Sequence, residues 1–246
     1  MQVIADADIA KAQADLALRG AAVLRGVVTP DMAQEMLAEV RPALPLAFSK
    51  VKTHNAYLVA DDPEFAPNHP RNAKAQTTSA TLAYDLVPDG ALRNLYLSPD
   101  LVDMIAKILG HEALYPYADP LAGLNVLLYE PGSELAWHFD NANFVVTLML
   151  QPAEAGGEYQ YFPFSRSESD EGFETVRKAL AEDLEGVEIL HQEPGDLVVF
   201  QGKHTLHRVS EVKGSKDRVI AVFSYDPTPG KTLNEDTRRT FYGRAA

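Results

Sequence analysis

The chain has 246 residues, of which 35 are acidic and 22 basic, giving a formal net charge of -13. Such an acidic balance argues against nucleic acid or an anionic membrane surface as a partner. The absence of cysteine excludes disulfides and thiolate metal ligands. There is no secretory pattern at the N-terminus and no apolar run of the roughly 18 residues that span a bilayer, so we expect a soluble cytoplasmic protein.

The first half of the chain is predicted to be largely helical. Alanines and leucines at helical spacing indicate a helix over 7–18, with Gly20 as its stop, and 21–25 reads as a short strand. Thr29-Pro30 is typical of a helix start and predicts a helix to about residue 40. Ser98-Pro99 opens another, which Gly110 ends.

Residues 48–83 show poor periodicity and predict no clear helix or strand. A stretch of that length without regular structure is usually functional or disordered, so it is a candidate lid over a binding site. Its Arg71 and Asn72 have side chains that could bind a substrate carboxylate. The alternative is a solvated surface loop.

The second half is predicted to be rich in β-strands, interrupted by one helix over about 171–184. Short strands separated by Gly and Pro turns are typical of a sandwich or barrel, and eight of them fit a jelly roll. The predicted strands are 123–130, 135–140, 144–151, 157–163, 187–191, 196–200, 206–212 and 218–226.

The predicted fold class is therefore α+β: a double-stranded β-helix (jelly roll, cupin-like) core with N-terminal helices packed on it. With no repeat and no linker, we expect one domain over 1–246. Its parts are a helical region at about 1–115, a jelly-roll core at about 120–228 and a C-terminal tail at 229–246.

The stretch Leu124–Asp140 carries the most informative pattern. It reads as a strand, a Pro131-Gly132 turn, and a second strand that ends in His138-Phe139-Asp140. Side chains two apart in a strand point to the same side, so an imidazole and a carboxylate enter one space. A second histidine would complete the 2-His-1-carboxylate facial triad of non-heme iron sites. Alternation turns Trp137 away from that space, and we expect it to pack.

The second histidine should come late in the chain, because chain-distant strands face each other across a jelly roll. His204 and His207 compete for the role. His207 is preferred because it opens the strand His-Arg-Val, whereas His204 falls in the turn before it and reads as an ordinary loop histidine.

Arg218 begins a strongly apolar strand eleven residues after His207. A guanidinium that enters a barrel interior needs a charge partner, and a dicarboxylate co-substrate would supply one through a bidentate pair. Capping of a surface strand is the alternative. Tyr129 ends the first strand of the core and is a candidate hydrogen-bond donor to the same co-substrate, with core packing as its alternative.

The order HxD, a distant HRV, and then an arginine resembles the Fe(II)/2-oxoglutarate-dependent oxygenases. More narrowly, the chain resembles the bacterial free-amino-acid group that contains radical lysine halogenases and amino-acid hydroxylases. The stretches that carry this resemblance are Asp119-Pro120-Leu121, Leu124-Asn125-Val126, Trp137-His138-Phe139-Asp140, Gly156-Gly157-Glu158, His207-Arg208-Val209, Ser224-Tyr225-Asp226 and Phe241-Tyr242-Gly243-Arg244.

The resemblance implies that His138, Asp140 and His207 hold Fe(II) and that Arg218 binds the distal carboxylate of 2-oxoglutarate. It also implies O2 as the oxidant and succinate and CO2 as co-products. Halogenases of this group carry Gly or Ala at the carboxylate position, which leaves a site for chloride. The presence of Asp140 therefore predicts a hydroxylase.

The expected partner is a small molecule, a free amino acid or a close derivative. Lysine-specific members carry an acidic residue where this chain has Asn141, and an amide cannot neutralise an ammonium. Asn141 and Asn143 are nevertheless candidates for binding an amino or side-chain group. The alternatives are the same iron chemistry with desaturation, cyclisation or another substrate, and a non-catalytic jelly-roll binding protein. The sequence leaves the oligomeric state open.

Overall fold

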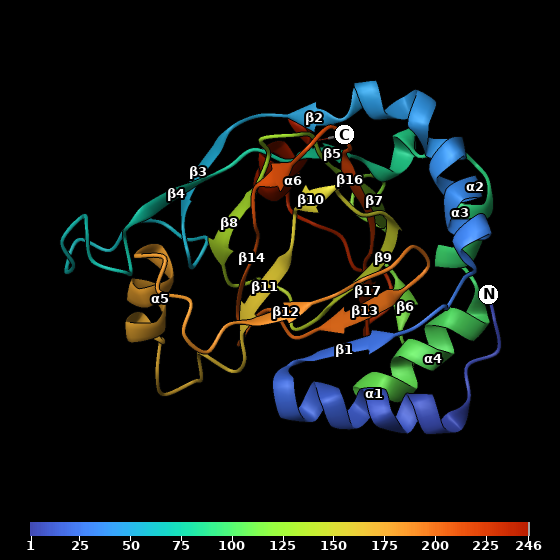
Figure 1. The fold of residues 1–246 in the computed structure, drawn as a ribbon, viewed down its shortest axis with the longest axis horizontal. Coiled ribbons are helices and arrows are strands. Elements are labelled where there is room, and N and C mark those ends of the chain that lie inside the picture. The colour runs from blue at the N-terminus through green and yellow to red at the C-terminus, as the bar shows by residue number, and fades with distance from the viewer. Residues whose placement is uncertain (246) are drawn as a thin grey trace.

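A computed structural model describes residues 1–245 and consists of two facing β-sheets with helices on both outer sides (Figure 1). The α-helices are α1 (Asp6–Arg19), α2 (Pro30–Val40), α3 (Ala91–Tyr96), α4 (Pro99–Leu109), α5 (Phe173–Leu180) and α6 (Glu235–Tyr242). Short 3-10 helices cover Arg41–Leu46 and Tyr84–Leu86. Among these residues no helix is long and apolar enough to cross a membrane.

The strands fall mostly in the second half of the chain. They are β1 (Ala21–Leu24), β2 (Phe48–Ser49), β3 (Lys52–Asn55), β4 (Lys74–Thr77), β5 (Ala80–Leu82), β6 (Tyr115–Pro116), β7 (Leu124–Tyr129), β8 (Leu135–His138), β9 (Val145–Gln151), β10 (Ala155–Gly156), β11 (Tyr159–Phe162), β12 (Glu188–Leu190), β13 (Leu197–Phe200), β14 (Leu206–Val209), β15 (Val212–Lys213), β16 (Arg218–Phe223) and β17 (Tyr225–Asp226).

The two main sheets form the predicted jelly roll. The larger has the order β1-β13-β9-β16-β7-β5-β2, and the smaller has the order β12-β11-β14-β8. All the pairings in these two sheets are antiparallel. The eight strands predicted from the sequence are four neighbouring strands of the larger sheet, β13, β9, β16 and β7, and the four strands of the smaller sheet. The α+β jelly-roll prediction is confirmed; the single-domain assignment stays a prediction.

Helices cover the outer face of each sheet. In Figure 1, α1, α2 and α4 lie beside the larger sheet and α5 lies beside the smaller one. The main core joins the first group to the larger sheet through buried side chains such as Leu16, Met36 and Leu148. A second cluster, which includes Trp137 and Val176, joins α5 to the smaller sheet. Removal of this apolar surface from water holds the layers together.

The expectation that residues 48–83 lack regular structure is wrong at both ends of the range, and the long stretch without a helix or strand is limited to residues 56–73. The two ends form two antiparallel pairs: β3 with β4, and β2 with β5, which continues the larger sheet beyond β7. The β3–β4 hairpin lies beside β8 of the smaller sheet (Figure 1). Residues 48–55 and 74–82, hereafter the crossing segments, therefore run from the larger sheet, where β5 pairs with β7, to the edge strand β8 of the smaller sheet.

The C-terminal tail contains a helix that the sequence analysis did not predict. Asn234 caps α6 by accepting a hydrogen bond from the Thr237 N–H at 2.8 Å. Asp119 is buried and accepts hydrogen bonds from Arg238 at 2.9 Å and from the Leu233 N–H at 2.7 Å. These bonds fix α6 against the start of β7.

Candidate metal centre

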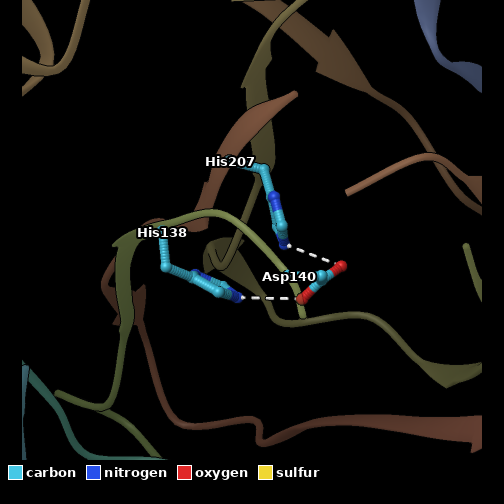
Figure 2. Close-up of side chains that lie close together, drawn as sticks. All are labelled: His138, Asp140 and His207. Carbon is cyan, nitrogen blue, oxygen red and sulfur yellow. Dashed lines mark ion pairs between the residues drawn. The ribbon is translucent and has the colours of Figure 1, made fainter. Parts of the chain in front are cut away.

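Three side chains from opposite ends of the β-rich region meet on the inner face of the smaller sheet. His138 ends β8, and His207 on β14 is its direct cross-strand partner. Asp140 follows β8, and its carboxylate faces the Nε2 atoms of both rings, 3.5 Å from His138 Nε2 and 3.6 Å from His207 Nε2 (Figure 2). In the described part of the chain, these three residues form a cluster whose candidate ligand atoms all lie within 4.8 Å of one another.

Both histidines are held in the same tautomer and orientation. The Nδ1 atom of His138 lies 2.9 Å from the backbone oxygen of Ala136, and that of His207 lies 2.9 Å from the oxygen of Thr205. A carbonyl only accepts, so each Nδ1 carries the proton and each Nε2 presents a lone pair. Backbone carbonyls that fix the second ring nitrogen are the usual support of histidine metal ligands.

The electrostatics favour the ligand forms of these groups. Burial, reinforced by the neighbouring His138, lowers the pKa of His207 to about 4, so its ring is neutral at neutral pH. Burial alone would raise the pKa of Asp140, but the two histidines outweigh it and the net pKa is lowered. The neutral imidazole of His207, the Nε2 atom of His138 and a carboxylate suit a divalent metal such as Fe(II) and would leave one face of it open.

Gly202, in the turn before β14, positions the carboxylate. Its backbone oxygen accepts a hydrogen bond from the Asp140 N–H at 3.0 Å. β8 itself ends at His138, two residues earlier than the sequence pattern predicts, so this contact, and not strand pairing, fixes Asp140. His204 lies in the same turn, and it is not part of the three-residue cluster.

Arg218 is a buried cation without an acidic partner in residues 1–245. Its side chain is among the largest that are fully buried, and Nη1 has no hydrogen-bond partner there. The guanidinium carbon lies 5.2 Å from the centre of the Tyr129 ring, and the two residues are direct partners in the pairing of β16 with β7. Because leaving such a charge unpaired is costly, the arrangement fits an anionic ligand, and a planar guanidinium suits a carboxylate.

Tyr159 connects the metal cluster to Arg218, and sequence reasoning did not single it out. Its ring stacks on His207 with centroids 5.5 Å apart. Burial raises its pKa strongly, Asp140 adds to that rise, and Arg218 opposes it, so Tyr159 lies within electrostatic range of both. The sequence signal that could have placed Tyr159 on the inner face of the sheet is its spacing of two from Tyr161 on β11. The residues present thus fit both a divalent metal and a carboxylate co-substrate.

The four predicted substrate residues lie in two different places. Asn141 and Asn143 directly follow Asp140 and are exposed. Asn72 is buried and uses its amide within its own loop, where it donates to the backbone oxygens of Asp62 and Phe65 at 2.8 and 2.9 Å. Arg71 donates to the Ala60 oxygen at 3.1 Å. The structure therefore does not bring Arg71 and Asn72 to the metal cluster.

Trp137 and Phe139 point away from the cluster, as strand alternation predicts. Trp137 packs against Phe162 with ring centroids 5.4 Å apart, under the guanidinium of Arg208 at 4.6 Å. Phe139 packs against Tyr57 at 5.4 Å. The ligands and the second apolar cluster thus occupy opposite faces of one strand.

A jelly roll that brings two histidines and one carboxylate together on its inner face is the architecture of the 2-oxoglutarate/Fe(II) oxygenases. A family model described as Halogenase D matches residues 4–241. The chain belongs to the Halogenase D family. No curated protein sequence matches it.

Solved structures with the same fold include three that share few residues with this chain. A 2OG-Fe(II) oxygenase family member from Burkholderia pseudomallei is 14% identical, with 93% of this chain and 95% of that chain covered and a TM-score of 0.54. The epimerase SnoN from nogalamycin biosynthesis is 15% identical, with coverages of 90% and 83% and a TM-score of 0.63. HygX from Streptomyces hygroscopicus, solved with nickel, 2-oxoglutarate and hygromycin B, is 13% identical, with coverages of 92% and 88% and a TM-score of 0.58.

Proposed function

We propose that the protein is an Fe(II)- and 2-oxoglutarate-dependent dioxygenase that hydroxylates an unactivated C–H bond of a free amino acid or a small amino-acid derivative. The observation that carries this proposal is the His138–Asp140–His207 cluster together with Arg218, which is buried on the facing sheet without an acidic partner in residues 1–245. A cytoplasmic location is part of the same proposal.

Iron bound with 2-oxoglutarate and O2 supplies the oxidising power for such a reaction, with succinate and CO2 as co-products. The chain's own residues would bind the metal and orient the co-substrate. His138 and His207 keep their Nε2 lone pairs directed at one point because their Nδ1 protons are committed to backbone carbonyls. Arg218 is placed to pair with the distal carboxylate of the co-substrate, and the buried phenol of Tyr129 stays protonated, since burial raises its pKa, and can donate a hydrogen bond to it.

Hydroxylation is favoured over halogenation by Asp140, although the family is described as Halogenase D. Halogenases of the group that the sequence resembles lack a carboxylate at this position. The variant Asp140→Gly separates the two outcomes: it should lose hydroxylation and accept chloride or bromide in the vacated position. Full hydroxylase activity in this variant would contradict the proposed role of Asp140.

The amino-acid substrate rests on the resemblance described above. Asn141 and Asn143 remain proposed substrate contacts because they are exposed beside Asp140 and none of the described hydrogen bonds involves their side chains. Arg71 and Asn72 would have to leave their loop contacts to take part. A second candidate keeps the iron chemistry but changes the substrate or outcome. It is favoured by the fold shared with SnoN, an epimerase, and HygX, solved with hygromycin B.

An anaerobic spectral titration tests the proposal. Metal-free protein is mixed with Fe(II) and then with 2-oxoglutarate, and the visible charge-transfer band of the chelate is followed. The band is expected at one equivalent of iron, and succinate release in air with a panel of amino acids then identifies the substrate. If the protein binds neither Fe(II) nor 2-oxoglutarate, the dioxygenase proposal fails and a non-catalytic jelly-roll binding protein is the remaining reading.

A further inference from the structure

Lys52, on strand β3, is a partly buried cation without an acidic partner in residues 1–245. Its ammonium lies 5.0 Å from the centre of the Phe241 ring on α6, and none of the described ion pairs or hydrogen bonds involves it. Burial lowers the pKa of this amine, and no carboxylate is close enough to oppose that effect. In a chain with 35 acidic residues, a partly buried lysine that pairs with none of them is notable.

The face of β3 that carries Lys52 is turned toward the metal cluster. Lys52 and His54 are two apart and share that face. The His54 ring lies 6.2 Å from the His138 ring, edge to face. Its Nε2 is 2.8 Å from the Thr77 hydroxyl, which also accepts a hydrogen bond from the Ala136 N–H of β8 at 3.0 Å. Lys52 is therefore one strand repeat, roughly 7 Å, from a side chain that borders a metal ligand.

Lys74 provides the contrast on the same hairpin. It is the cross-strand partner of Asn55, and it forms an ion pair with Asp61. The positions of Lys74 and Thr77 on β4 differ by an odd number, so Lys74 faces away from the side that carries Thr77 and Lys52. One lysine of the hairpin is thus neutralised on the outer side, while the one on the metal side is not.

Packing on Phe241 does not by itself account for Lys52. A cation over an aromatic ring contributes about 0.5–1 kcal/mol at an exposed site, and the partly buried Lys52 ammonium has no counter-ion to offset the hydration that it has lost. An anion that arrives with a ligand would balance it. Arg218, which is fully buried, is already assigned to the co-substrate.

We propose that Lys52 is a specificity-determining residue that binds the carboxylate of the substrate, with the Phe241 ring covering the ammonium. This inference rests on the proposed function and narrows its substrate class to small carboxylic acids, free amino acids among them. A carboxylate held near β3 keeps the substrate's first carbons away from the metal. The oxidised carbon is therefore a side-chain carbon several bonds from the carboxylate, not the α-carbon.

The test compares acids with their amides. Fe(II)- and 2-oxoglutarate-loaded enzyme is assayed for succinate release with the proteinogenic L-amino acids and, in parallel, with their carboxamides, which keep the shape but lose the charge. The variants are Lys52→Met, Lys52→Gln and Lys52→Arg, with Lys74→Met as the matched control. The charge-transfer band is recorded for each protein first, and thermal unfolding confirms that each is folded.

The wild type should prefer the best acid over its amide by about tenfold or more in kcat/KM, because a charge-assisted hydrogen bond is lost in the amide. In Lys52→Met and Lys52→Gln this preference should fall to about one, through KM with kcat little changed. Lys52→Arg should restore part of it, and Lys74→Met should keep all of it. The charge-transfer band should be the same in all five proteins.

Three results would overturn the inference. They are a preference retained in both Lys52→Met and Lys52→Gln, an equal loss in Lys74→Met, and a wild type with a normal charge-transfer band that no carboxylic acid in the panel stimulates. In each of these the band is intact, so the proposed iron and 2-oxoglutarate chemistry stands, although the third result would also remove free amino acids as the substrate. Absence of the band in the wild type is the separate result that removes the proposed function, and the role of Lys52 with it.

Discussion

The carboxylate of Asp140 occupies the space into which a side chain at Gly202 would project. A Cβ atom built on Gly202 would stand 1.8 Å from Asp140 Oδ2 and 3.0 Å from Asp140 Cβ. The same Cβ would stand 2.5 Å from Asp140 Cγ, which does not move when the carboxylate rotates about the Cβ–Cγ bond, so that rotation does not relieve the clash. The absence of a side chain at Gly202 is therefore required for the observed position of the Asp140 carboxylate, a proposed metal ligand.

Gly202→Ala should weaken Fe(II) binding by about tenfold or more, the size of effect typical when a residue that supports a metal ligand is lost. Titration of the metal-free protein with Fe(II) measures it. Gly110→Ala is the control: a Cβ there meets nothing within 4 Å, but the backbone has φ +71°. That variant should lose about 1 kcal/mol of stability and keep its iron affinity. Equal iron affinity in both variants would refute the role of Gly202.

His207 and His204 are separated by removing each in turn. His207→Ala should abolish turnover and lower iron affinity, since it deletes a ligand atom from the cluster. His204→Ala should keep most of both. Iron binding and succinate release are measured on the same preparations. The opposite pattern would assign the second histidine ligand to His204, in the turn before β14.

Replacement of Arg218 should separate co-substrate binding from stability. Arg218→Met should raise the KM for 2-oxoglutarate about a hundredfold or more, because a bidentate charged pair is lost. The metal-free variant should unfold at the same or a higher urea concentration than the wild type, because a buried charge without an acidic partner has been removed. Arg208→Met is the control, since its guanidinium pairs with the exposed Glu182 at 2.7 Å on the outer face. A wild-type KM in Arg218→Met would contradict the assignment.

The metal-free protein should lose stability as the pH falls from about 7 to 4. In the unfolded chain His207 takes up a proton near its ordinary value of 6.5, whereas in the folded chain it does so only near 4. Between these values the unfolded form binds more protons, so stability rises with pH. The change from this group is up to about 3 kcal/mol. The lowered pKa of Asp140 acts in the same direction at the acidic end.

Urea unfolding of metal-free protein between pH 4.5 and 7.5 measures this slope. His207→Gln should flatten it, because the variant has no proton to take up at this position. His204→Gln should keep the wild-type slope. A slope that is the same in all three proteins would show that His207 does not titrate as described.

The strands of the jelly roll were predictable because each carries its own signal. β7, β9, β13 and β16 are apolar runs bounded by turn residues, and the HxD pattern needs only strand alternation. The choice of His207 over His204 depended on where β14 begins. Gly202 could not be recognised, since its importance comes from a contact between two turns 62 positions apart in sequence.

The crossing segments and α6 escaped prediction for a different reason. β2 to β5 are two to four residues long and rich in polar side chains, and α6 is strongly polar, so neither has a long apolar period. Their conformations depend on pairing with β7, on the neighbouring β8 and on the hydrogen bonds of Asp119. The position of Lys52 beside Phe241, and that of its strand beside His138, follow from those long-range contacts.

The proposed metal and co-substrate residues and the proposed substrate contact thus lie in parts of the chain with different sequence patterns. The jelly-roll strands and the turns next to them carry the proposed metal ligands and Arg218, whereas the proposed carboxylate contact lies on a crossing segment. If Lys52 has the proposed role, a sequence comparison that relies on the jelly-roll strands will group enzymes by their co-substrate and will not distinguish the substrates that they oxidise. Substrate classes within this family are better sorted by aligning the short polar strands around residue 52 and the aromatic end of the C-terminal helix.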